Sequence, residues 1–277
     1  MTSTDTARGR WVPLDGAVNA RDLGGVPLTD GGATAHGVVL RADNLQGLTD
    51  ADVHRLVDRL GVRRVVDLRT GVEVELEGPG PLVRDGRVEV RHRSLHPEYG
   101  DRTDVEVDDV MPWQVRESAG GDEAETPAVR SYLGYLRDRP DSIVAALRDA
   151  THASGATIVH CAAGKDRTGV VCALALAVAG ATRESIVEDY VATGERIGPI
   201  MARLVASPTY AAELEGSPAD AHRPRPETMD RVLDVLEERH GGPLGWLEEA
   251  GFGDDDVALL RERLSAGRSA RASGGSR

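Results

Sequence analysis

Apolar and polar residues alternate with two different periods along the first half of the chain. Residues 38–43 (VVLRAD) form a short apolar run that predicts a strand, and residues 49–61 place an apolar stripe along one face of a predicted helix. Thr49 can cap the start of that helix, and Gly61 can end it. Residues 62–69 and 88–95 are rich in valine and predict two further strands.

The second half of the chain has mainly helical patterns. Residues 127–140 and 141–151 predict two helices separated at Pro140. Residues 156–160 (ATIVH) are an unbroken apolar run of the kind found in strands that are buried on both faces. Residues 168–180 predict a helix that is apolar nearly all round, so we expect it at the centre of the core.

Further helices complete the chain. Thr182 can cap a helix over residues 183–197, and the pattern up to about Leu264 predicts more helices, with a loop at residues 217–226. Strands interleaved with helices, followed by a helical C-terminal half, are typical of an α/β protein. We therefore expect one α/β domain over residues 11–265.

Three segments lie outside this pattern. Residues 1–10 are polar, residues 266–277 are small and basic, and residues 100–126 are strongly acidic with interspersed glycines. We expect a flexible N-terminus, a disordered C-terminal tail and an acidic surface insertion or mobile loop. Solvation explains the charges of the acidic segment more simply than a specific role does.

Composition narrows the classes of function. Hydrophobic residues make up 40% of the 277 and aromatic residues 3%, with a single phenylalanine, so the core must be aliphatic. The formal net charge is -13, and so acidic a chain lacks the cationic face that nucleic acid or an anionic membrane requires. We therefore expect no nucleic-acid partner and no stable membrane association, although a local pocket can still hold a phosphate group.

Cysteine usage and hydropathy indicate a protein of the reducing cytoplasm. Two cysteines make no disulfide framework, and residues 1–30 show no signal-peptide pattern, although leaderless secretion stays open. The longest uncharged apolar run, residues 168–182, is too short to span a bilayer.

One segment, HCAAGKDRTG at residues 160–169, joins the predicted buried strand to the predicted buried helix. The loop amides can turn inward as a nest, and the first turn of the helix adds unpaired N–H groups, both of which favour a bound dianion such as phosphate. The same environment favours the thiolate form of Cys161, which is a nucleophile. The predicted phosphate-binding residues are Ala162, Ala163, Gly164, Lys165, Asp166 and Arg167.

Arg167 and Thr168 complete the predicted reaction centre. A planar guanidinium can bind two equatorial phosphoryl oxygens as charge shifts during transfer, and the C-x5-R spacing lets the loop close around the phosphorus. The Thr168 hydroxyl can donate to the sulfur and help it leave. The predicted reaction is displacement to a phosphocysteine followed by hydrolysis, with no metal or cofactor. Cys172, inside the apolar helix, is instead explained as core packing.

The loop is similar to the H-C-x5-R-[ST] signature of cysteine-dependent protein tyrosine and dual-specificity phosphatases. Its GKDR form resembles the bacterial branch of tyrosine/serine and phosphoinositide phosphatases, typified by a mycobacterial member. NARDLGG, residues 48–80, DYVATGERI and LGWLEEAGF carry the resemblance along most of the chain. It implies the phosphatase α/β sandwich, with a central, mostly parallel sheet flanked by helices, and a helical lid at about residues 199–227.

The leaving oxygen needs a general acid, and the sequence offers three candidates. The WPD tripeptide that supplies this acid in many relatives is absent, since residues 111–113 read MPW. The resemblance implies Asp166, within the loop, or Glu98, which follows a proline where similar bacterial enzymes carry an acidic residue. Asp67 ends a predicted strand, where sites in α/β sheets gather, although a structural role suits it better. We place Asp166 first, Glu98 second and Asp67 third.

Other residues are expected to support the loop. Lys165 is either a solvated lysine or, as the resemblance implies, a second anchor for substrates with more than one phosphate. His160 either fixes the loop by hydrogen bonding to the backbone or is a satisfied core histidine. A supporting shell, for which a structural role is favoured, comprises Asn19, Arg21, Asp22 and Arg69.

Three functions fit these residues. The first is a phosphomonoester hydrolase acting on phosphotyrosine, phosphoserine or phosphothreonine, with phosphoinositides as a further candidate class. The second keeps the chemistry but serves a small phosphorylated metabolite, since the acidic segment could restrict access. The third, a phosphate-binding module without turnover, is disfavoured by the intact Cys161, Arg167 and Thr168.

Overall fold

A computed structural model describes residues 9–96, 125–214 and 216–265. Glu98, nearly all of the acidic segment, and the tail from residue 266 lie outside the described residues, as do residues 1–8. Arg10, which the sequence placed in a flexible terminus, is buried and donates to Asp189 at 2.8 Å. The described domain therefore includes Arg10.

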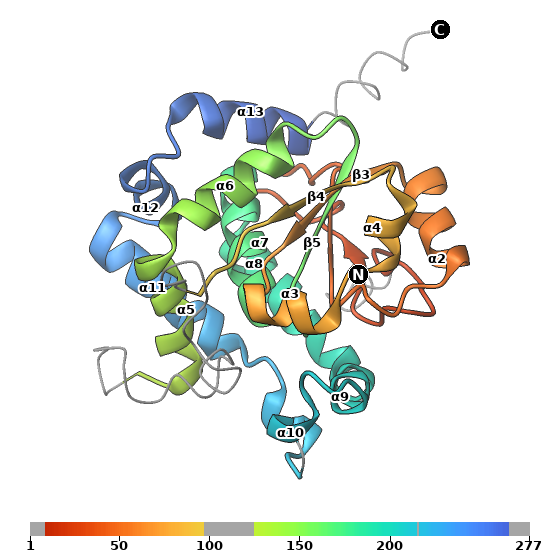
Figure 1. Ribbon diagram of the computed structural model, residues 1–277. Coiled ribbons are helices and arrows are strands. Elements are labelled where there is room, and N and C mark those ends of the chain that lie inside the picture. Colours follow the sequence, from red (N-terminus) through yellow and green to blue (C-terminus); the bar gives the residue numbers. More distant parts are fainter. Residues whose placement is uncertain (1–8, 97–124, 215, 266–277) are drawn as a thin grey trace, which may run out of the picture.

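Five strands form one sheet in the order β1-β2-β5-β3-β4 (Figure 1). The strands are β1 (Arg21–Asp22), β2 (Val39–Ala42), β3 (Val62–Asp67), β4 (Glu89–His92) and β5 (Ala156–His160). β1 is antiparallel to β2, and the other pairs are parallel, which confirms the predicted α/β class with a mostly parallel central sheet. β4 is shorter than predicted and exposed, as suits an edge strand.

Alternate residues of the central strands enter cores on opposite faces of the sheet. On β5, Ile158 packs in one core and Val159 in the other, and Val65 and Val66 of β3 do the same. Successive strand residues point to opposite faces, so a sheet covered on both sides needs continuous apolar runs rather than alternation.

The larger core lies between the sheet and a layer of helices. This layer comprises α5 (Pro127–Asp138), α6 (Pro140–Thr151), α7 (Asp166–Ala179), α8 (Arg183–Ala192), α11 (Pro226–His240), α12 (Pro243–Glu249) and α13 (Asp254–Ser265). α7 is buried along nearly its whole length, as predicted. Pro140 separates α5 from α6, and Thr182 caps α8, both as the sequence indicated.

The opposite face carries shorter helices. These are α2 (Asp50–His54), the π-helical turn η1 (Arg55–Arg59) and α4 (Pro81–Asp85), which pack in the smaller core. α3 (Gly71–Glu77) follows the carboxyl end of β3. The helix predicted at residues 49–61 is confirmed, with Thr49 as its cap. Its second half is π-helical, since the Leu60 N–H bonds to the Arg55 carbonyl five residues back. α3 and α4 were not predicted, although a Thr70–Glu73 capping box begins α3.

A separate group of helices projects below the sheet in Figure 1. It comprises the 3-10 turn η3 (Thr193–Arg196), α9 (Ile197–Ala206), α10 (Ala211–Leu214) and the 3-10 turn η4 (Ala219–His222), which lies in the predicted 217–226 loop. The apolar face of α9 and Tyr210 pack on Ala162. None of the described helices is long and apolar enough to cross a membrane.

Candidate active site

The cysteine loop, residues 161–165, connects the end of β5 to the start of α7. Gly164 has a φ of 65°, in the left-handed region. A Cβ at this position would lie 2.3 Å from the Ala42 carbonyl oxygen. Only glycine satisfies both constraints, so the loop can pass close to the end of β2.

Polar side chains hold the carbonyl groups of the cysteine loop from outside. The Asn19 amide donates to the Ala163 carbonyl at 2.9 Å and to that of Gly164 at 3.1 Å. The Arg41 guanidinium donates to the Gly164 carbonyl at 2.7 Å. None of the hydrogen bonds formed among the described residues uses the backbone N–H groups of residues 162–167. These groups are therefore available to an anion.

A buried carboxylate organises the arginines beneath the cysteine loop. Asp189 accepts from Arg10 at 2.8 Å, from Arg21 at 3.2 Å and from Arg41 at 2.6 Å. Burial alone would raise the pKa of Asp189, but the three guanidinium groups hold that pKa well below its usual range. Arg21 also donates to Asn19 at 2.6 Å. One carboxylate facing three cations leaves positive charge under the loop.

Sequence analysis identified Arg21 and Asn19 as supports but missed Arg41 and Asp189. The available signal was the DYVATGERI stretch, which contains Asp189. Asp22, predicted in the same shell, lies elsewhere: its carboxylate accepts the amides of Gly24 and Gly37 at 2.8 Å and orders the N-terminal turns.

The two cysteines occupy different environments. Cys161 is 2% exposed and lies at the start of the loop with the unpaired N–H groups. The Thr168 hydroxyl is fully buried and has no hydrogen-bond partner among the described residues. Cys172 lies inside α7, where burial raises the pKa of its thiol to about 11 and keeps it protonated.

Arg167 forms a buried bidentate ion pair with Glu73. Its Nη1 atom donates to Oε2 at 2.5 Å and its Nη2 atom donates to Oε1 at 3.0 Å. Burial alone would lower the pKa of Arg167, but the Glu73 carboxylate raises it well above its usual value. Nε is buried without a partner among the described residues, so Nε and the second N–H of Nη2 are left for two further oxygens.

Glu73 is a site residue that sequence analysis missed. Its carboxylate accepts the Thr70 N–H at 2.8 Å as part of the capping box of α3. The T-x-x-E pattern at residues 70–73 was the available signal, but it indicates a helix start and says nothing of Arg167.

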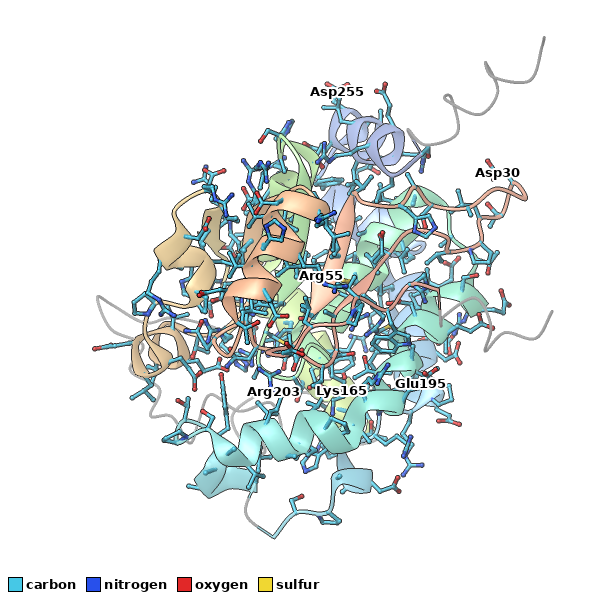
Figure 2. The ribbon with its side chains drawn as sticks, turned by 90° about the vertical axis from the view of Figure 1, so that its right-hand side faces the viewer. Asp30, Arg55, Lys165, Glu195, Arg203 and Asp255 are labelled. Carbon is cyan, nitrogen blue, oxygen red and sulfur yellow. The ribbon has the colours of Figure 1, made fainter. Side chains whose placement is uncertain are left out.

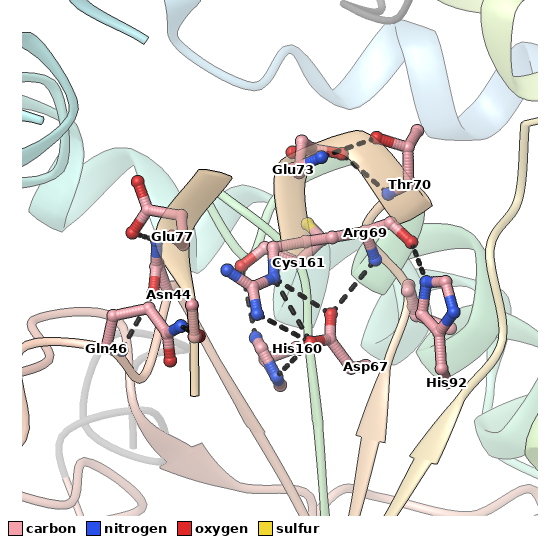
Figure 3. A network of polar contacts seen from close by, with 12 residues as sticks. Asn44, Gln46, Asp67, Arg69, Thr70, Glu73, Glu77, His92, His160 and Cys161 are labelled. Atoms are coloured by element: carbon pink, nitrogen blue, oxygen red, sulfur yellow. Dashed lines mark hydrogen bonds and ion pairs between the residues drawn. The ribbon is translucent and has the colours of Figure 1, made fainter. Parts of the chain in front are cut away.

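The three candidate general acids differ in their surroundings. Asp166 accepts a hydrogen bond from the Tyr132 hydroxyl at 2.6 Å. Glu98 lies outside the described residues. Asp67 is buried against Arg69, 2.6 Å away, as Figure 3 shows. Burial alone would raise the pKa of Asp67, but its contacts with the His160 imidazole and with Arg69 hold that pKa well below its usual range, which suits a structural ion pair rather than a proton donor.

His160 and Lys165 both contact backbone carbonyls. The His160 Nδ1 atom lies 3.3 Å from the Cys161 carbonyl and its Nε2 atom lies 3.6 Å from Asp67. Burial lowers the pKa of His160, so the ring is neutral at pH 7. Lys165 donates to the His222 carbonyl at 2.8 Å and is largely buried. It therefore ties the cysteine loop to η4 instead of extending into solvent.

Side chains of the α9–α10 segment bind the elements around the loop. The Tyr210 hydroxyl donates to Glu73 at 3.1 Å, and the Ser207 hydroxyl donates to Glu77 at 2.6 Å. Figure 2 shows Arg203 on α9 beside the body of the protein, with Lys165 near the same helix. The segment therefore covers the loop and is fastened at several points.

A cavity of about 660 Å³ adjoins Asp166 and Lys165. Its other walls come from residues 125–132 of α5 and the residues before it, from Tyr190, and from residues 221–231. Within the described part of the chain, no group of three or more His, Cys, Asp and Glu side chains is placed to hold a metal ion.

Known proteins resemble this chain over most of its length. The sequence profile of the tyrosine phosphatase family matches residues 12–266. A tyrosine-protein phosphatase of Nostoc commune is 30% identical over 233 residues, which cover 81% of this chain and 73% of that protein. The triple specificity protein phosphatase PtpB of Mycobacterium tuberculosis is 29% identical over 279 residues, which cover 90% and 96% of the two chains.

Among solved structures, TpbA of P. aeruginosa is 18% identical and gives a TM-score of 0.31, over 68% of this chain and 84% of that chain. The relatives in sequence confirm the resemblance that the loop and its flanking motifs indicated. Because the family profile spans nearly the whole domain, cysteine loop included, we conclude that this chain is a hydrolase of the tyrosine phosphatase family.

Proposed function

We propose that this protein hydrolyses phosphomonoesters through a phosphocysteine at Cys161, with phosphotyrosine, phosphoserine and phosphothreonine as its substrates. One observation carries the proposal: the backbone N–H groups of residues 162–167 have no hydrogen-bond partner among the described residues, and the loop to which they belong begins at a buried cysteine and leads to a buried arginine. A ring of N–H donors at a helix N-terminus binds a phosphoryl dianion, and it stabilises a thiolate in the same way.

Substrate binding would use the donors that the protein leaves unpaired. The amides of residues 162–167 would take the non-bridging oxygens, and Arg167 would add its Nε–H and the second N–H of Nη2. Glu73 fixes the plane of that guanidinium before substrate arrives, so little reorganisation is needed when charge shifts onto the equatorial oxygens.

The chemistry would proceed in two displacements. The Cys161 thiolate attacks phosphorus, an S–P bond forms, and the leaving oxygen takes the P–O electron pair and a proton from Asp166. Water then attacks the phosphocysteine, Asp166 accepts a proton from that water, and the S–P electron pair returns to sulfur. The Thr168 hydroxyl can donate to the departing thiolate in this second step.

Access to the site would require motion of the α9–α10 segment, in line with a lid at about residues 199–227. Cys161 is 2% exposed, and Ala162 packs against the apolar face of α9. A phosphorylated side chain cannot reach the sulfur while this packing is intact. Lid segments of this kind exclude water during phosphoryl transfer and set the rate of substrate binding or product release.

Substrate range is supported by the relative from M. tuberculosis, which is named a triple specificity protein phosphatase. Phosphoinositides are a further candidate class, for which Lys165 would supply a second cation. The cavity of about 660 Å³ favours one alternative, a small phosphorylated metabolite, because its size is that of a small-molecule pocket. A cytoplasmic location would keep Cys161, which forms no disulfide, in its reduced form.

Phosphate release tests the proposal. Cys161→Ser should abolish turnover, whereas Cys172→Ala, at the other cysteine, should retain it. Acid quench should trap phosphate on wild-type protein through an acid-stable thiophosphate bond that the Cys161→Ser variant lacks. Turnover that survives in Cys161→Ser would contradict the mechanism, and phosphate binding without turnover in the wild type would indicate a binding module.

A substrate panel separates the proposed substrates from the alternative. Phosphopeptides carrying phosphotyrosine, phosphoserine or phosphothreonine, phosphoinositides, and phosphorylated sugars and nucleotides would be compared by kcat/KM. The proposal expects the highest kcat/KM values on phosphopeptides. A marked preference for one sugar or nucleotide phosphate would instead show a metabolite phosphatase.

A further inference from the structure

Asp166 differs from the other buried carboxylates around the cysteine loop in its hydrogen-bond donor. Glu73, Asp67 and Asp189 are each held by guanidinium groups. Asp166 instead accepts from a neutral hydroxyl, that of Tyr132 on α5, at 2.6 Å, and lies 3.5 Å from the Lys165 ammonium. Of these four carboxylates, Asp166 is therefore the one that no guanidinium of the described residues holds.

Both contacts reach the same oxygen of Asp166. The Tyr132 hydroxyl and the Lys165 ammonium lie at Oδ1, and no hydrogen bond among the described residues uses Oδ2. When the carboxyl is protonated, Oδ1 is the better acceptor for Tyr132, so the proton is placed on Oδ2. The Tyr132 hydrogen bond, together with the Lys165 ammonium, therefore distinguishes Oδ1 from Oδ2.

A chain of hydroxyl groups fixes the direction of this bond. The Tyr132 and Tyr190 hydroxyl oxygens are 2.9 Å apart, a geometry in which either could be the donor. Because the single Tyr132 proton is donated to Asp166, the Tyr190 hydroxyl must donate to Tyr132. Burial and the nearby Asp166 carboxyl raise the pKa of Tyr132 well above its usual value, so Tyr132 remains a donor at neutral pH.

We propose that Tyr132 is the positioning residue of the general acid: it holds Oδ1 of Asp166 so that Oδ2 presents its proton to the leaving oxygen. This inference rests on the proposed function, since it requires Asp166 to supply the proton. Its place in the fold fits the role, because Tyr132, Asp166 and Tyr190 all line the cavity that adjoins the loop. That cavity can hold the leaving group.

The neighbouring tyrosine supplies a matched control. Tyr135 lies one helical turn along α5, stacks on Tyr132 with ring centroids 6.1 Å apart, and is equally buried. Its hydroxyl has no hydrogen-bond partner among the described residues. Tyr135→Phe and Tyr132→Phe therefore each remove one buried hydroxyl from the same helix, but only the second removes a bond to Asp166.

The experiment measures kcat/KM for aryl and alkyl phosphates whose leaving groups span a wide range of pKa. A poor leaving group such as an alkoxide depends on protonation, whereas p-nitrophenolate leaves without it. Tyr132→Phe should lose about 10-fold or more on alkyl phosphates, out of the 10²- to 10⁴-fold that an acid supplies, and little on p-nitrophenyl phosphate. Tyr135→Phe should match the wild type across the series.

Asp166→Asn and the double variant complete the test. Asp166→Asn should show the same dependence on leaving group, more strongly, and adding Tyr132→Phe to it should cause no further loss. Two results would overturn the role of Tyr132 and leave that of Asp166 intact. One is a loss of kcat/KM in Tyr132→Phe that is equal for all leaving groups, and the other is a loss that adds fully to that of Asp166→Asn in the double variant. If Tyr132→Phe does not fold, Tyr190→Phe replaces it, because it breaks the chain of hydroxyl groups one step further from Asp166. Tyr190→Phe should show a smaller loss of kcat/KM, confined to poor leaving groups. A loss of kcat/KM that is equal for all leaving groups would overturn the inference.

Failure of the proposed function gives different results. If Asp166→Asn shows no dependence on leaving group, another residue is the general acid and the inference falls with that assignment. If the wild type releases no phosphate from any ester, the proposed function itself is wrong.

Discussion

Arg167 and Glu73 are 94 residues apart in the sequence and form a bidentate ion pair in which both side chains are almost completely buried. The pair joins the helix that follows the cysteine loop to α3, and Tyr210 of the segment over the loop donates to the same carboxylate. The Glu73 carboxylate thus fixes the guanidinium that we propose to bind phosphate, and it is itself contacted by the segment that covers the loop.

Glu73→Gln should therefore reduce both stability and activity. Glutamine offers one acceptor oxygen and turns an NH2 donor toward the second guanidinium nitrogen, so the bidentate pair is lost. Loss of one partner of a buried ion pair costs about 3–5 kcal/mol. We expect a lower free energy of unfolding in urea, and a kcat/KM reduced about 10²- to 10³-fold because Arg167 is no longer fixed. Glu75→Gln, at an exposed position of α3, is the control, and an unchanged kcat/KM in Glu73→Gln would contradict the assignment.

Ile200→Ala should make Cys161 more accessible. Ile200 is fully buried in the cluster that α9 forms with Ala162, and truncation of a buried isoleucine costs about 2–5 kcal/mol. Weaker packing raises the population of the open state, so iodoacetamide should alkylate Cys161 at least about 10-fold faster, since each 1.4 kcal/mol is tenfold. Val205→Ala, on the exposed side of α9, should change nothing, and equal rates in both variants would show that α9 does not limit access.

Asn19→Leu should loosen the cysteine loop. The side chain holds two loop carbonyls and accepts from Arg21, and an unsatisfied buried polar group costs about 1–3 kcal/mol. We expect a lower melting temperature and a smaller stabilisation by added phosphate, because the N–H groups of the loop are no longer aligned. Asn44→Ala is the control variant. Asn44 binds the Ala162 carbonyl through its backbone N–H, and the substitution keeps that bond. Wild-type stabilisation by phosphate in Asn19→Leu would count against the supporting role.

His96 should make the protein sensitive to acid. Burial is the main cause that lowers the pKa of His96 from 6.5 to about 3, and the positive charge of the nearby Arg167 is the second cause. Between pH 6.5 and pH 3 the unfolded chain therefore binds a proton at His96 that the folded state does not bind. The free energy of unfolding falls as the pH is lowered through this range, by about 1.4 kcal/mol per pH unit below 6.5. His96→Phe, which keeps a ring against Tyr135, should remove this contribution.

The measurement for His96 is the free energy of unfolding in urea at pH 7 and at pH 5. The difference between His96→Phe and wild type should shift in favour of the variant at the lower pH. Exposed His54 gives the control variant His54→Gln. A pH-independent difference between His96→Phe and wild type would show that the buried ring does not titrate as described.

Local sequence determined the elements whose causes lie within a few residues. The apolar run at residues 156–160 gave β5, Pro140 ended α5, and Thr182 supplied the cap of α8. The cysteine loop followed from the same logic, since a strand, a glycine and a helix start are adjacent in the chain. The helix after Thr49 was also predicted, but the residue pattern did not distinguish the α-helical hydrogen bonding of its first half from the π-helical hydrogen bonding after His54.

Only the tertiary structure decided which side chains meet the loop. Glu73, Tyr132 and Asp189 come from three separate helices and Tyr210 from the turn between α9 and α10, and each looks locally like a cap, a helix residue or a core aromatic. Their pairing with Arg167, Arg41 and Asp166 depends on how distant elements pack, because a buried charge or hydroxyl takes whichever partner the fold brings within reach. The motif was enough to propose Cys161 as the nucleophile, whereas the contacts that hold and cover its loop could not be predicted from the sequence.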